Sequence, residues 1–241
     1  MTLERSDRLR VLVRLLFIQA SLHRKGMQNI GVMHALDAVA PKIAPDPLAL
    51  LARHAGHFNT NPNAAPIVIG GVLRIEEDGL AVSPAPVSRF EQVACSALAA
   101  MGDVLTVGAL KPLALTLAVA SAIYSSFTGL VAIVVLYNGA LLAGRAWGLA
   151  FGYARGWGVV EAFTGARVQR VVMLARVLAA LAGGALLAVL ARRAFAEGLH
   201  DLAVIVIATA GAWLAMKRGW NVARLAIVLF PVVVIVAMLV K

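Results

Sequence analysis

Seven polar side chains with amide, hydroxyl or carboxylate groups lie in three short stretches near the start of the sequence. They are Gln28, Asn29, Asn59, Thr60, Asn61, Glu76 and Glu77. Planar amides and carboxylates form paired hydrogen bonds with neighbouring hydroxyl groups, so this set has the chemistry of a sugar-binding site. The same amide and hydroxyl residues also cap helices and form turns. A substrate site and a purely structural role are therefore both open.

Two ionisable residues, Asp103 and Lys111, stand at the start of a long hydrophobic region. Charged groups inside a membrane are costly and usually face a cavity or a partner, which favours a functional role near a re-entrant tip or a subunit contact. The alternative places both at the membrane interface, with the lysine extending to the lipid headgroups. The two residues are about 12 Å apart along a straight helix, so they cannot pair directly there.

Other familiar kinds of site are not indicated. His54 and His57 share one helix face, but no further ligand stands at a spacing suitable for a metal, so both are expected at the surface. Cys95, the only cysteine, is expected to be a small buried residue. The sequence shows no nucleophile with its base and no phosphate-binding loop. We therefore expect no catalysis by this chain alone, no cofactor and no bound metal.

The composition is that of a membrane protein. Hydrophobic residues make up 61% of the 241 residues and charged residues only 14%, against about 25% charged in soluble domains. The formal net charge of +10 is not clustered as nucleic-acid binding requires, so no nucleic-acid partner is expected. Residues 1–103 are almost neutral, whereas residues 104–241 carry twelve basic and three acidic residues. We predict an all-α integral membrane protein with a cytoplasmic-side helical region over 1–103 and a hydrophobic membrane region over 104–241.

Short helices separated by turns are expected in the first region. Around residues 5–17, arginines interrupt apolar residues, which predicts an amphipathic helix that lies in the lipid headgroup layer or else on an ordinary protein surface. Three further helices are expected over residues 26–40, 46–58 and 64–77. Pro47 is expected at a first helical position, and Gly79 just after the end of a helix. The proline-containing residues 80–88 are expected to form a loop.

The second region is predicted to contain about five hydrophobic segments. No charge occurs in residues 112–144, a stretch of 33 residues that would be about 50 Å long as one helix. A bilayer core is about 30 Å thick, so we expect a turn near Tyr124–Gly129 and either two membrane passes or a re-entrant hairpin. The five segments are expected over residues 104–123, 127–147, 171–190, 202–216 and 225–240.

The positions of lysine and arginine predict an orientation in the membrane. If all five segments cross, a cytoplasmic N-terminus places seventeen basic residues on the inside and three on the outside. A re-entrant segment would reverse the loops that follow it. We therefore expect the N-terminus on the cytoplasmic side of the membrane.

Four glycines, Gly144, Gly148, Gly152 and Gly156, recur at every fourth position. Such a ladder leaves one helix face without side chains, so that another backbone can approach closely. The ladder therefore predicts a packing seam, either within the chain or against another subunit.

Several motifs follow one another in a fixed order within residues 8–165. They are Met27-Gln28-Asn29-Ile30-Gly31, Phe58-Asn59-Thr60-Asn61-Pro62, Glu76-Glu77, Gly102-Asp103, Lys111-Pro112 and Trp147-Gly148-Leu149-Ala150-Phe151-Gly152-Tyr153. In this order they resemble the IID membrane component of the mannose/fructose/sorbose-type sugar phosphotransferase system. Members of that family typically show M-Q-N-L-G, F-N-T-H-P, a helix that ends in Glu-Glu, G-D-S, R-P and Y-G-L-x-Y-G-Y.

The resemblance implies a membrane subunit that forms the sugar-translocating unit with a IIC subunit. Cytoplasmic IIA and IIB subunits would phosphorylate the incoming hexose, and the IID chain would carry no phosphohistidine. It further implies a hetero-oligomer in the bacterial inner (cytoplasmic) membrane and a fold with re-entrant hairpins. The seven polar residues, together with Asp103 and Lys111, would then contribute to substrate binding.

The sequence departs from the family pattern at three places. Ser96-Ala97 stands where the family has Gly-Pro, which would stiffen a hinge. Val104 replaces a serine, and Asn61 replaces the histidine of F-N-T-H-P. These departures motivate an alternative function, a regulatory or sensory IID-like module of an incomplete phosphotransferase system. A third alternative is an unrelated helical membrane protein whose motifs match by chance.

Overall fold

The computed structural model describes residues 3–79, 84–164, 166–197, 211 and 217. Residues 1–183 form one compact unit and residues 184–241 a second. The packing described below belongs to the first unit. The described part is helical, and its only extended pairings are isolated bridges that join Met27 to His23 and to Phe58. The predicted helical class is therefore confirmed for these residues.

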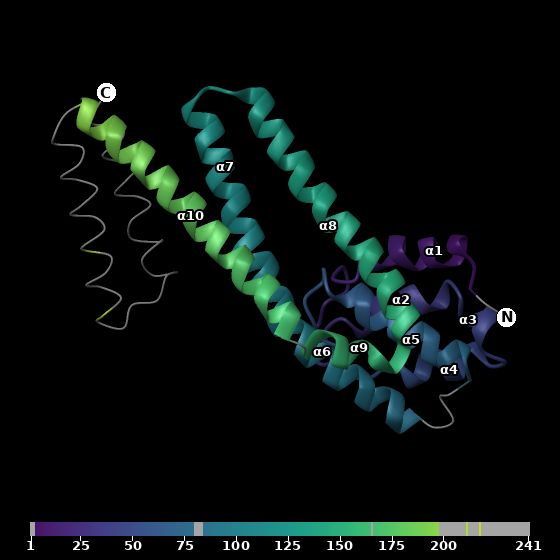
Figure 1. Ribbon diagram of the computed structural model, residues 1–241. Helices are drawn as coiled ribbons and strands as arrows, with labels where there is room; N and C mark the ends of the chain where they lie inside the picture. Colours follow the sequence, from purple (N-terminus) through teal and green to yellow (C-terminus); the bar gives the residue numbers. More distant parts are fainter. Residues whose placement is uncertain (1–2, 80–83, 165, 198–210, 212–216, 218–241) are drawn as a thin grey trace. The chain divides into compact units, whose positions relative to one another are not determined.

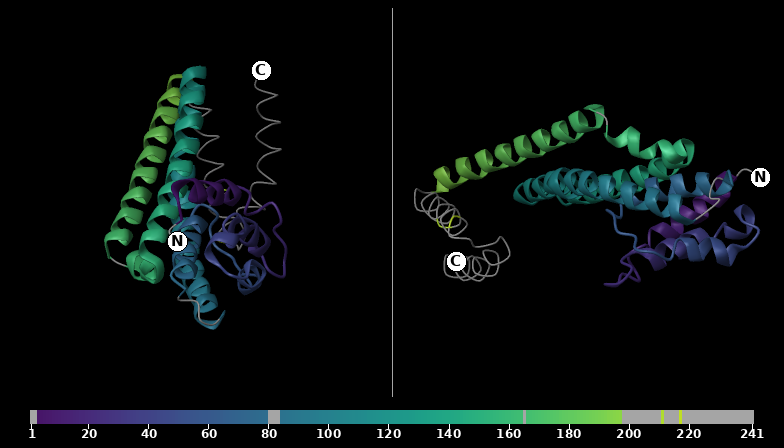
Figure 2. Two further views of the ribbon diagram at one scale, coloured as in Figure 1. Left: turned by 90° about the vertical axis from the view of Figure 1, so that its right-hand side faces the viewer. Right: turned by 90° about the horizontal axis from the view of Figure 1, so that it is seen from below.

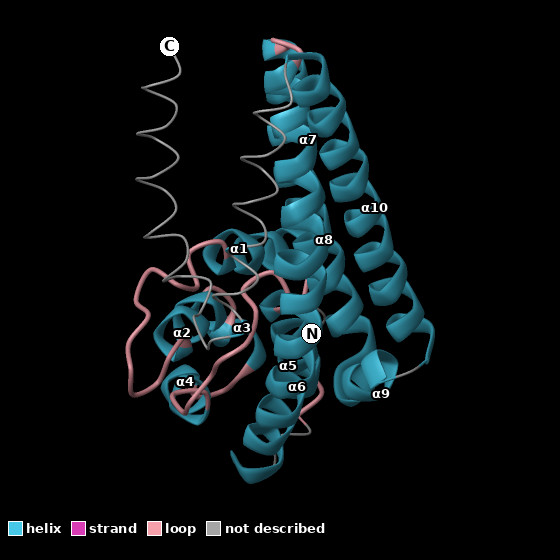
Figure 3. Ribbon diagram, turned by 90° about the vertical axis from the view of Figure 1, so that its left-hand side faces the viewer, coloured by secondary structure: helices cyan, strands magenta, loops and turns pink. Residues whose placement is uncertain are grey.

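Short helices come first along the described chain, and long helices follow (Figures 1 and 3). The short helices are α1 (Arg5–Leu15), α2 (Asn29–Asp37), α3 (Ala40–Ile43), α4 (Pro47–Arg53) and α5 (Ala65–Glu77). The long helix α6 (Pro84–Leu105) continues through the π-helical segment η1 (Thr106–Leu110) into α7 (Lys111–Ile123), and the long helix α8 (Phe127–Arg155) follows. The last elements are the 3₁₀ turn η2 (Gly156–Gly158), α9 (Val159–Thr164) and α10 (Ala166–Glu197).

Local sequence signals set several helix ends. Asp46 caps α4, because its side-chain oxygen accepts hydrogen bonds of 3.0 Å from the backbone N–H groups of Leu48 and Ala49. Pro47 occupies the first helical position, as predicted. Gly79 follows α5 with a φ of +65°, a left-handed conformation that glycine adopts without strain. Both predicted ends are confirmed.

Several predicted boundaries are wrong; the helix expected over 46–58, for example, ends at Arg53, so His54 and His57 do not share a helix. α6 begins at Pro84, within the 80–88 stretch that was expected to be a loop. Proline is tolerated in a first turn, because the first N–H groups of a helix have no partner inside it. The helix predicted from residue 26 begins only at Asn29, since Met27 has a φ of +56°, which no α-helix can contain.

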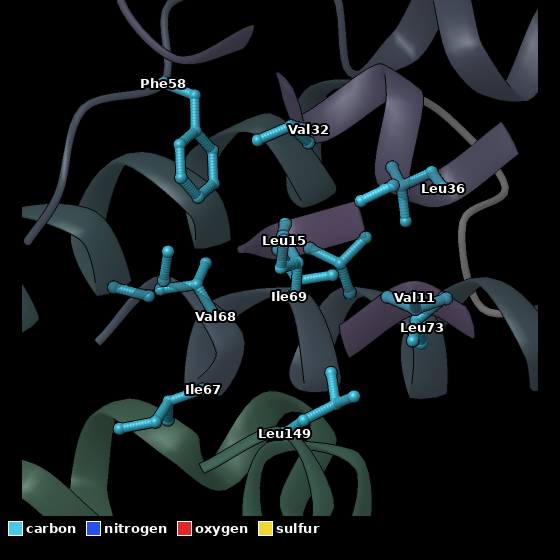
Figure 4. Packing of buried hydrophobic residues seen from close by; sticks show 14 of the residues in the cluster. Val11, Leu15, Val32, Leu36, Phe58, Ile67, Val68, Ile69, Leu73 and Leu149 are labelled. Atoms are coloured by element: carbon cyan, nitrogen blue, oxygen red, sulfur yellow. The ribbon is translucent and has the colours of Figure 1, made fainter. Parts of the chain in front are cut away.

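Helix α5 is the centre of the N-terminal region. Its residues are buried without interruption from Ala65 to Leu73, as expected for a helix that is apolar on all sides. In Figure 4, side chains of α1 and α2, including Leu15, lie on one side of α5, and Leu149 of α8 lies on the other. α5 therefore joins the short helices to the long ones.

The backbones of α5 and α8 touch. A Cβ atom built on Gly70 would collide with the carbonyl oxygen of Leu149 in α8. One built on Gly152 would collide with the carbonyl oxygen of Ile67 in α5. Only glycine fits at these two positions, because any side chain would push the helices apart.

The four glycines of the ladder have different surroundings. Gly148 and Gly152 face α5 of the same chain, and a Cβ on Gly148 would lie 2.8 Å from the side chain of Ile67. Nothing lies within 4 Å of such an atom on Gly144. Gly156 ends α8 with a φ of +51°. The close contact within the chain is thus made by the two middle glycines.

Helices α7 and α8 form a hairpin that turns at Tyr124–Ser126 (Figure 1). The predicted turn is therefore present, and the Ser126 hydroxyl caps α8 by accepting a 3.1 Å hydrogen bond from the Gly129 N–H. By length and composition, two stretches of the described chain could cross a membrane, Ala85–Ile123 and Phe127–Phe163.

The other predicted segments are only partly described. The third, over 171–190, lies within α10. The fourth, over 202–216, and the fifth, over 225–240, lie outside the described residues apart from residue 211.

Replacing Gly152 with leucine should prevent α5 from packing on α8, because the collision is with backbone and no change of rotamer relieves it. Overpacking costs about 1–3 kcal/mol and occasionally more. The matched control is Gly139→Leu in the same helix, since a Cβ on Gly139 has nothing within 4 Å. The measurement is the yield of monodisperse protein in detergent and its melting temperature. Equal values for the two variants would contradict the seam.

Candidate functional site at the helix break

The loop that follows α4 is attached to the junction of α6 and α7 through Asn61. The side-chain N–H group of Asn61 donates to the carboxylate of Asp103 at 2.8 Å and to the hydroxyl of Thr106 at 3.1 Å. Its side-chain oxygen accepts a 2.9 Å hydrogen bond from the backbone N–H of Asn63. Asn61 is buried, and a Cβ on Gly102 would lie only 2.6 Å from it. The motifs that contain Asn61 and Gly102-Asp103 therefore meet in space.

The junction itself is a π-helical turn over Thr106–Leu110, in which the Lys111 N–H bonds to the Thr106 carbonyl. Pro112 explains the widening, because proline lacks an N–H and its ring clashes with the carbonyl four residues earlier in a regular helix. π-helical turns relieve such conflicts and are frequent at functional sites. Asp103 and Lys111 therefore flank this π-helical turn over Thr106–Leu110, called the helix break below, at the base of the α7–α8 hairpin. This is not a position at the tip of the hairpin, whereas the alternative prediction, a contact with another subunit, stays a prediction.

Gln28 holds the same loop from the opposite side. Its amide forms two hydrogen bonds with the backbone of Thr60, donating to the carbonyl at 2.9 Å and accepting from the N–H at 3.1 Å. The Thr60 hydroxyl donates to the carbonyl of Cys95 at 3.1 Å. Cys95 is buried, as predicted. The buried amide and hydroxyl thus fix the loop against α6.

Asn29 lies apart from this network. Its side-chain N–H group donates to the Ala55 carbonyl at 2.6 Å, and its buried side-chain oxygen has no partner among the described residues. Among the nine residues predicted for the substrate site, Asn59, Asp103 and Lys111 are exposed. Polar groups available to a ligand are therefore concentrated at the loop and the helix break.

An open cavity of about 270 Å³ lies beside the Asn61 network, between α5, the helix break and α8. Its walls are almost entirely apolar, and Trp147 and Phe163 provide aromatic surfaces. Two polar residues, Asn63 and Thr106, line it. Both are engaged, since Asn63 accepts a 2.9 Å hydrogen bond from Arg145 and Thr106 donates to the Gly102 carbonyl at 2.7 Å. The cavity offers apolar contact and few free hydrogen-bonding groups.

The structure places Glu76 and Glu77 away from the helix break. Glu77 accepts hydrogen bonds from the Leu3 N–H at 2.5 Å and from the Tyr153 hydroxyl. Glu76 is 4% exposed and pairs with Arg53 at 2.5 Å and with His54 at 3.1 Å. Both carboxylates thus join parts of the protein to one another.

The prediction that His54 lies at the surface is wrong, whereas His57 is exposed. His54 is 2% exposed, and its Nδ1 atom lies 2.7 Å from the Glu91 carboxylate. Both ring nitrogens therefore face carboxylates, one from Glu76 and one from Glu91, and both must carry protons to donate. With Arg53, these residues form a buried cluster whose charges cancel.

The cluster changes the pKa values of its members. Burial alone would lower the pKa of His54, but the hydrogen bonds and charges of Glu76 and Glu91 raise it from 6.5 to about 9. Burial alone would raise the pKa of Glu76, but His54 and Arg53 outweigh it and hold that pKa below its ordinary value. The charged forms of both residues are thus favoured.

Sequence reasoning missed Thr106, Asn63, Arg145 and Glu91. Arg145 was detectable as the first charge after 33 uncharged residues, and Asn63 lies two residues after Asn61. Nothing local distinguishes Thr106 or Glu91, because their partners are 45 and 37 residues away in the sequence.

Residues 2–196 match the sequence profile of the PTS system mannose/fructose/sorbose family IID component. The chain belongs to this family. The mannose-specific EIID component of Escherichia coli K12 is 27% identical over 191 residues, which cover 76% of this chain and 68% of that protein. The sorbose-specific EIID component of Lacticaseibacillus casei is 30% identical over 136 residues, 55% of this chain and 48% of that protein.

The fold of this IID component also occurs in a solved complex. A cryo-EM structure of the mannose transporter ManYZ with microcin E492 contains a chain with a TM-score of 0.61 and 23% identity. The likeness covers 100% of this chain and 98% of that chain. This IID component is therefore a membrane protein of the sugar phosphotransferase system, and its fold is like that of a chain in the solved complex.

Two departures from the family pattern can be located in this IID component. α6 runs from Pro84 to Leu105 without a break at Ser96-Ala97, which agrees with the loss of a Gly-Pro pair there. Asn61, where the family typically has histidine, makes the contacts with Asp103 and Thr106. The irregular turn of this helix lies at Thr106–Leu110, next to Pro112.

The stability of this IID component should fall as the pH rises from about 6.5 to about 9. The folded chain holds a proton on His54 in this range that the unfolded chain has released, because the pKa is raised to about 9 by folding. This proton contributes about 3 kcal/mol to the free energy of unfolding. The contribution is fully present below pH 6.5 and is lost as the pH rises through about 9. The measurement is the melting temperature in detergent against pH. His54→Gln should abolish the slope and the exposed His57→Gln should keep it; a slope unchanged in His54→Gln would disprove the assignment.

Proposed function

We propose that this chain is the membrane subunit that forms a sugar-translocation unit with a IIC subunit, in a permease that imports a hexose coupled to phosphorylation by IIA and IIB partners. Membership of the family supports the assignment of this chain as a IID component. The likeness in fold to a chain of a solved transporter complex supports the role of a membrane subunit. The proposed assembly is a hetero-oligomer in the bacterial inner membrane.

One observation carries this proposal. Two motifs typical of the family, Phe58–Pro62 and Gly102-Asp103, converge on the break between α6 and α7, where Asn61 binds both Asp103 and Thr106. A loop anchored at a π-helical turn of a membrane helix places exposed polar groups beside a kind of turn that is frequent at functional sites. Asn59, Asp103 and Lys111 present exposed side chains at this place.

The sugar site is proposed to be shared with the IIC subunit. A hexose carries several hydroxyl groups, each of which needs a partner when it is buried. The cavity beside the break has mostly apolar walls, and its two polar residues are engaged within the chain. This chain would supply an aromatic wall and the side chains of Asn59, Asp103 and Lys111. The IIC subunit would supply the remaining hydrogen bonds. Gln28, Asn29, Thr60 and Asn61 would shape this site, while Glu76 and Glu77 would act from a distance by holding the N-terminal region together.

The proposed orientation places the N-terminus and the short helices on the cytoplasmic side. The bias in lysine and arginine supports it, since ten of the basic residues lie in residues 1–103. In that orientation, the region packed on α5 lies on the side where IIA and IIB operate.

A regulatory role without transport is the second candidate. The continuous α6 at Ser96-Ala97 and the presence of Val104 support it, because a helix without the Gly-Pro pair flexes less. The two candidates differ in whether sugar moves.

Uptake of radiolabelled mannose should require this chain in vesicles that also contain the IIC subunit and are supplied with IIA and IIB. Gly152→Leu should lose both assembly of the complex and uptake. The matched control, Gly139→Leu, should retain both. Absence of uptake for every tested sugar, from a complex that assembles normally, would support the regulatory role instead.

Replacing Asn59 with alanine should weaken sugar binding by the complex about 5- to 150-fold. A buried hydrogen bond and an unsatisfied partner are together worth about 1–3 kcal/mol. His57→Ala, two residues earlier and also exposed, should leave affinity unchanged. Affinity and melting temperature are measured on the same samples. Normal affinity with a lowered melting temperature would make Asn59 a turn residue and withdraw it from the site.

A further inference from the structure

A groove of about 400 Å³ runs between α1 and α8, away from the cavity at the helix break. α1 and α8 pack together in the same compact unit, and Figure 2 shows α1, in purple, from two further sides. One wall is formed by α1 and the other by α8. The lining residues are Arg5, Arg8, Leu9, Leu12, Ala146, Leu149 and Ala150. Two cationic groups therefore stand over a floor of apolar side chains.

The arginines of α1 differ in what they pair with. Arg10 lies 3.8 Å from Asp7, and Arg14 lies 2.9 Å from Asp37. Within the described residues, no carboxylate pairs with Arg5 or Arg8, the two arginines of the groove. The helix thus neutralises the arginines outside the groove and leaves those inside it available to an anion.

Arg8 is also held in place. Its guanidinium group stacks over the ring of Tyr153 at 4.9 Å from the ring centre, a favourable cation–π contact. The Tyr153 hydroxyl donates to Glu77, which is also bound by the Leu3 N–H. A guanidinium fixed on an aromatic ring keeps its N–H groups free for a phosphate oxygen.

The groove lies at the level of α8 where a membrane interface is expected. The uncharged stretch ends at Gly144, and α8 from Phe127 to that residue is about 27 Å long, close to the thickness of a bilayer core. Arg145 and Trp147 follow, and Trp147 is 57% exposed, a residue type enriched where hydrocarbon meets headgroups. Ala146 and Ala150 are therefore at headgroup depth.

The apolar floor continues toward the hydrocarbon. Leu142 of α8 is 50% exposed, and Leu9 and Val13 of α1 are 59% and 49% exposed. The alanines of α8 leave space that a larger side chain would fill. An anion that carried no hydrocarbon would leave this apolar surface uncovered, whereas a lipid would cover it.

We propose that this groove is a binding site for one anionic phospholipid. Its phosphate group is held by Arg5 and Arg8, and an acyl chain lies along the α8 face past Ala146 and Leu142. The lipid joins α1 to α8 at the membrane surface. This site is separate from the sugar site, and it does not depend on transport.

The test uses the purified full-length chain in a neutral detergent, with dioleoylphosphatidylglycerol as the probe and native mass spectrometry as the readout. Two arginines near a membrane surface contribute enough to predict binding about 30-fold weaker in the Arg5→Gln/Arg8→Gln double variant. The matched control, Arg24→Gln/Lys25→Gln, removes the same charge from exposed residues outside the groove. It should bind as the wild type does, and dioleoylphosphatidylcholine should bind weakly to all.

A third variant separates a lipid from a free anion. Ala150→Leu keeps both arginines and fills the groove, so phosphatidylglycerol binding should fall while the melting temperature without lipid stays normal. Equal loss in the two charge variants would overturn the site, since it would show general electrostatic attraction. Displacement of the lipid by an equal concentration of inorganic phosphate, or unchanged binding in Ala150→Leu, would overturn the role of the acyl chain.

Discussion

The contact between the backbones of α5 and α8 is the constraint on which the other features depend. Gly70 and Gly152 let the two helices touch, and α5 carries the short helices on its other side. Touching backbones fix the distance between the N-terminal region and the hairpin to a single value. The pairing of Arg145 with Asn63, the groove between α1 and α8, and the bond from Tyr153 to Glu77 all follow from that distance. A side chain at either glycine would change all of them together.

The buried cluster of Arg53, His54, Glu76 and Glu91 serves a different purpose. A buried ion pair is not in itself stabilising, because removing charges from water costs as much as their attraction returns. Its members come from α4, from the residue after it, from α5 and from α6. In this arrangement of the helices every charge of the cluster has a partner, and removal of one partner costs about 3–5 kcal/mol. The cluster therefore penalises arrangements that would separate its members.

Features set by neighbours in the sequence could be predicted. Pro47, Gly79 and the turn at Tyr124–Ser126 act through their own backbone conformation, so composition alone places them. The apolar character of α5 predicted a helix but could not name what covers it. The start of α6 was missed because proline forms a first helical turn as readily as a loop.

Features made by distant residues could not be predicted. His54 reads as a surface histidine until α5 and α6 bring carboxylates to both its nitrogens. The motifs predicted a polar set, but the sequence could not separate amides that hold the loop from those that remain exposed. That division depends on which groups lie opposite each amide after folding, namely the Thr60 backbone for Gln28 and the side chains of Asp103 and Thr106 for Asn61.

The Asn61 contacts link the loop to the angle of the membrane helix. One amide group donates to Asp103 before the π-helical turn and to Thr106 within it. A change in the angle between α6 and α7 must therefore either break these bonds or carry the loop with it. Leaving a buried polar group unsatisfied costs about 1–3 kcal/mol, so the loop moving with the helix is the cheaper course. Because Asn59 lies on that loop, a substrate held there would be coupled to the helix angle through one buried asparagine.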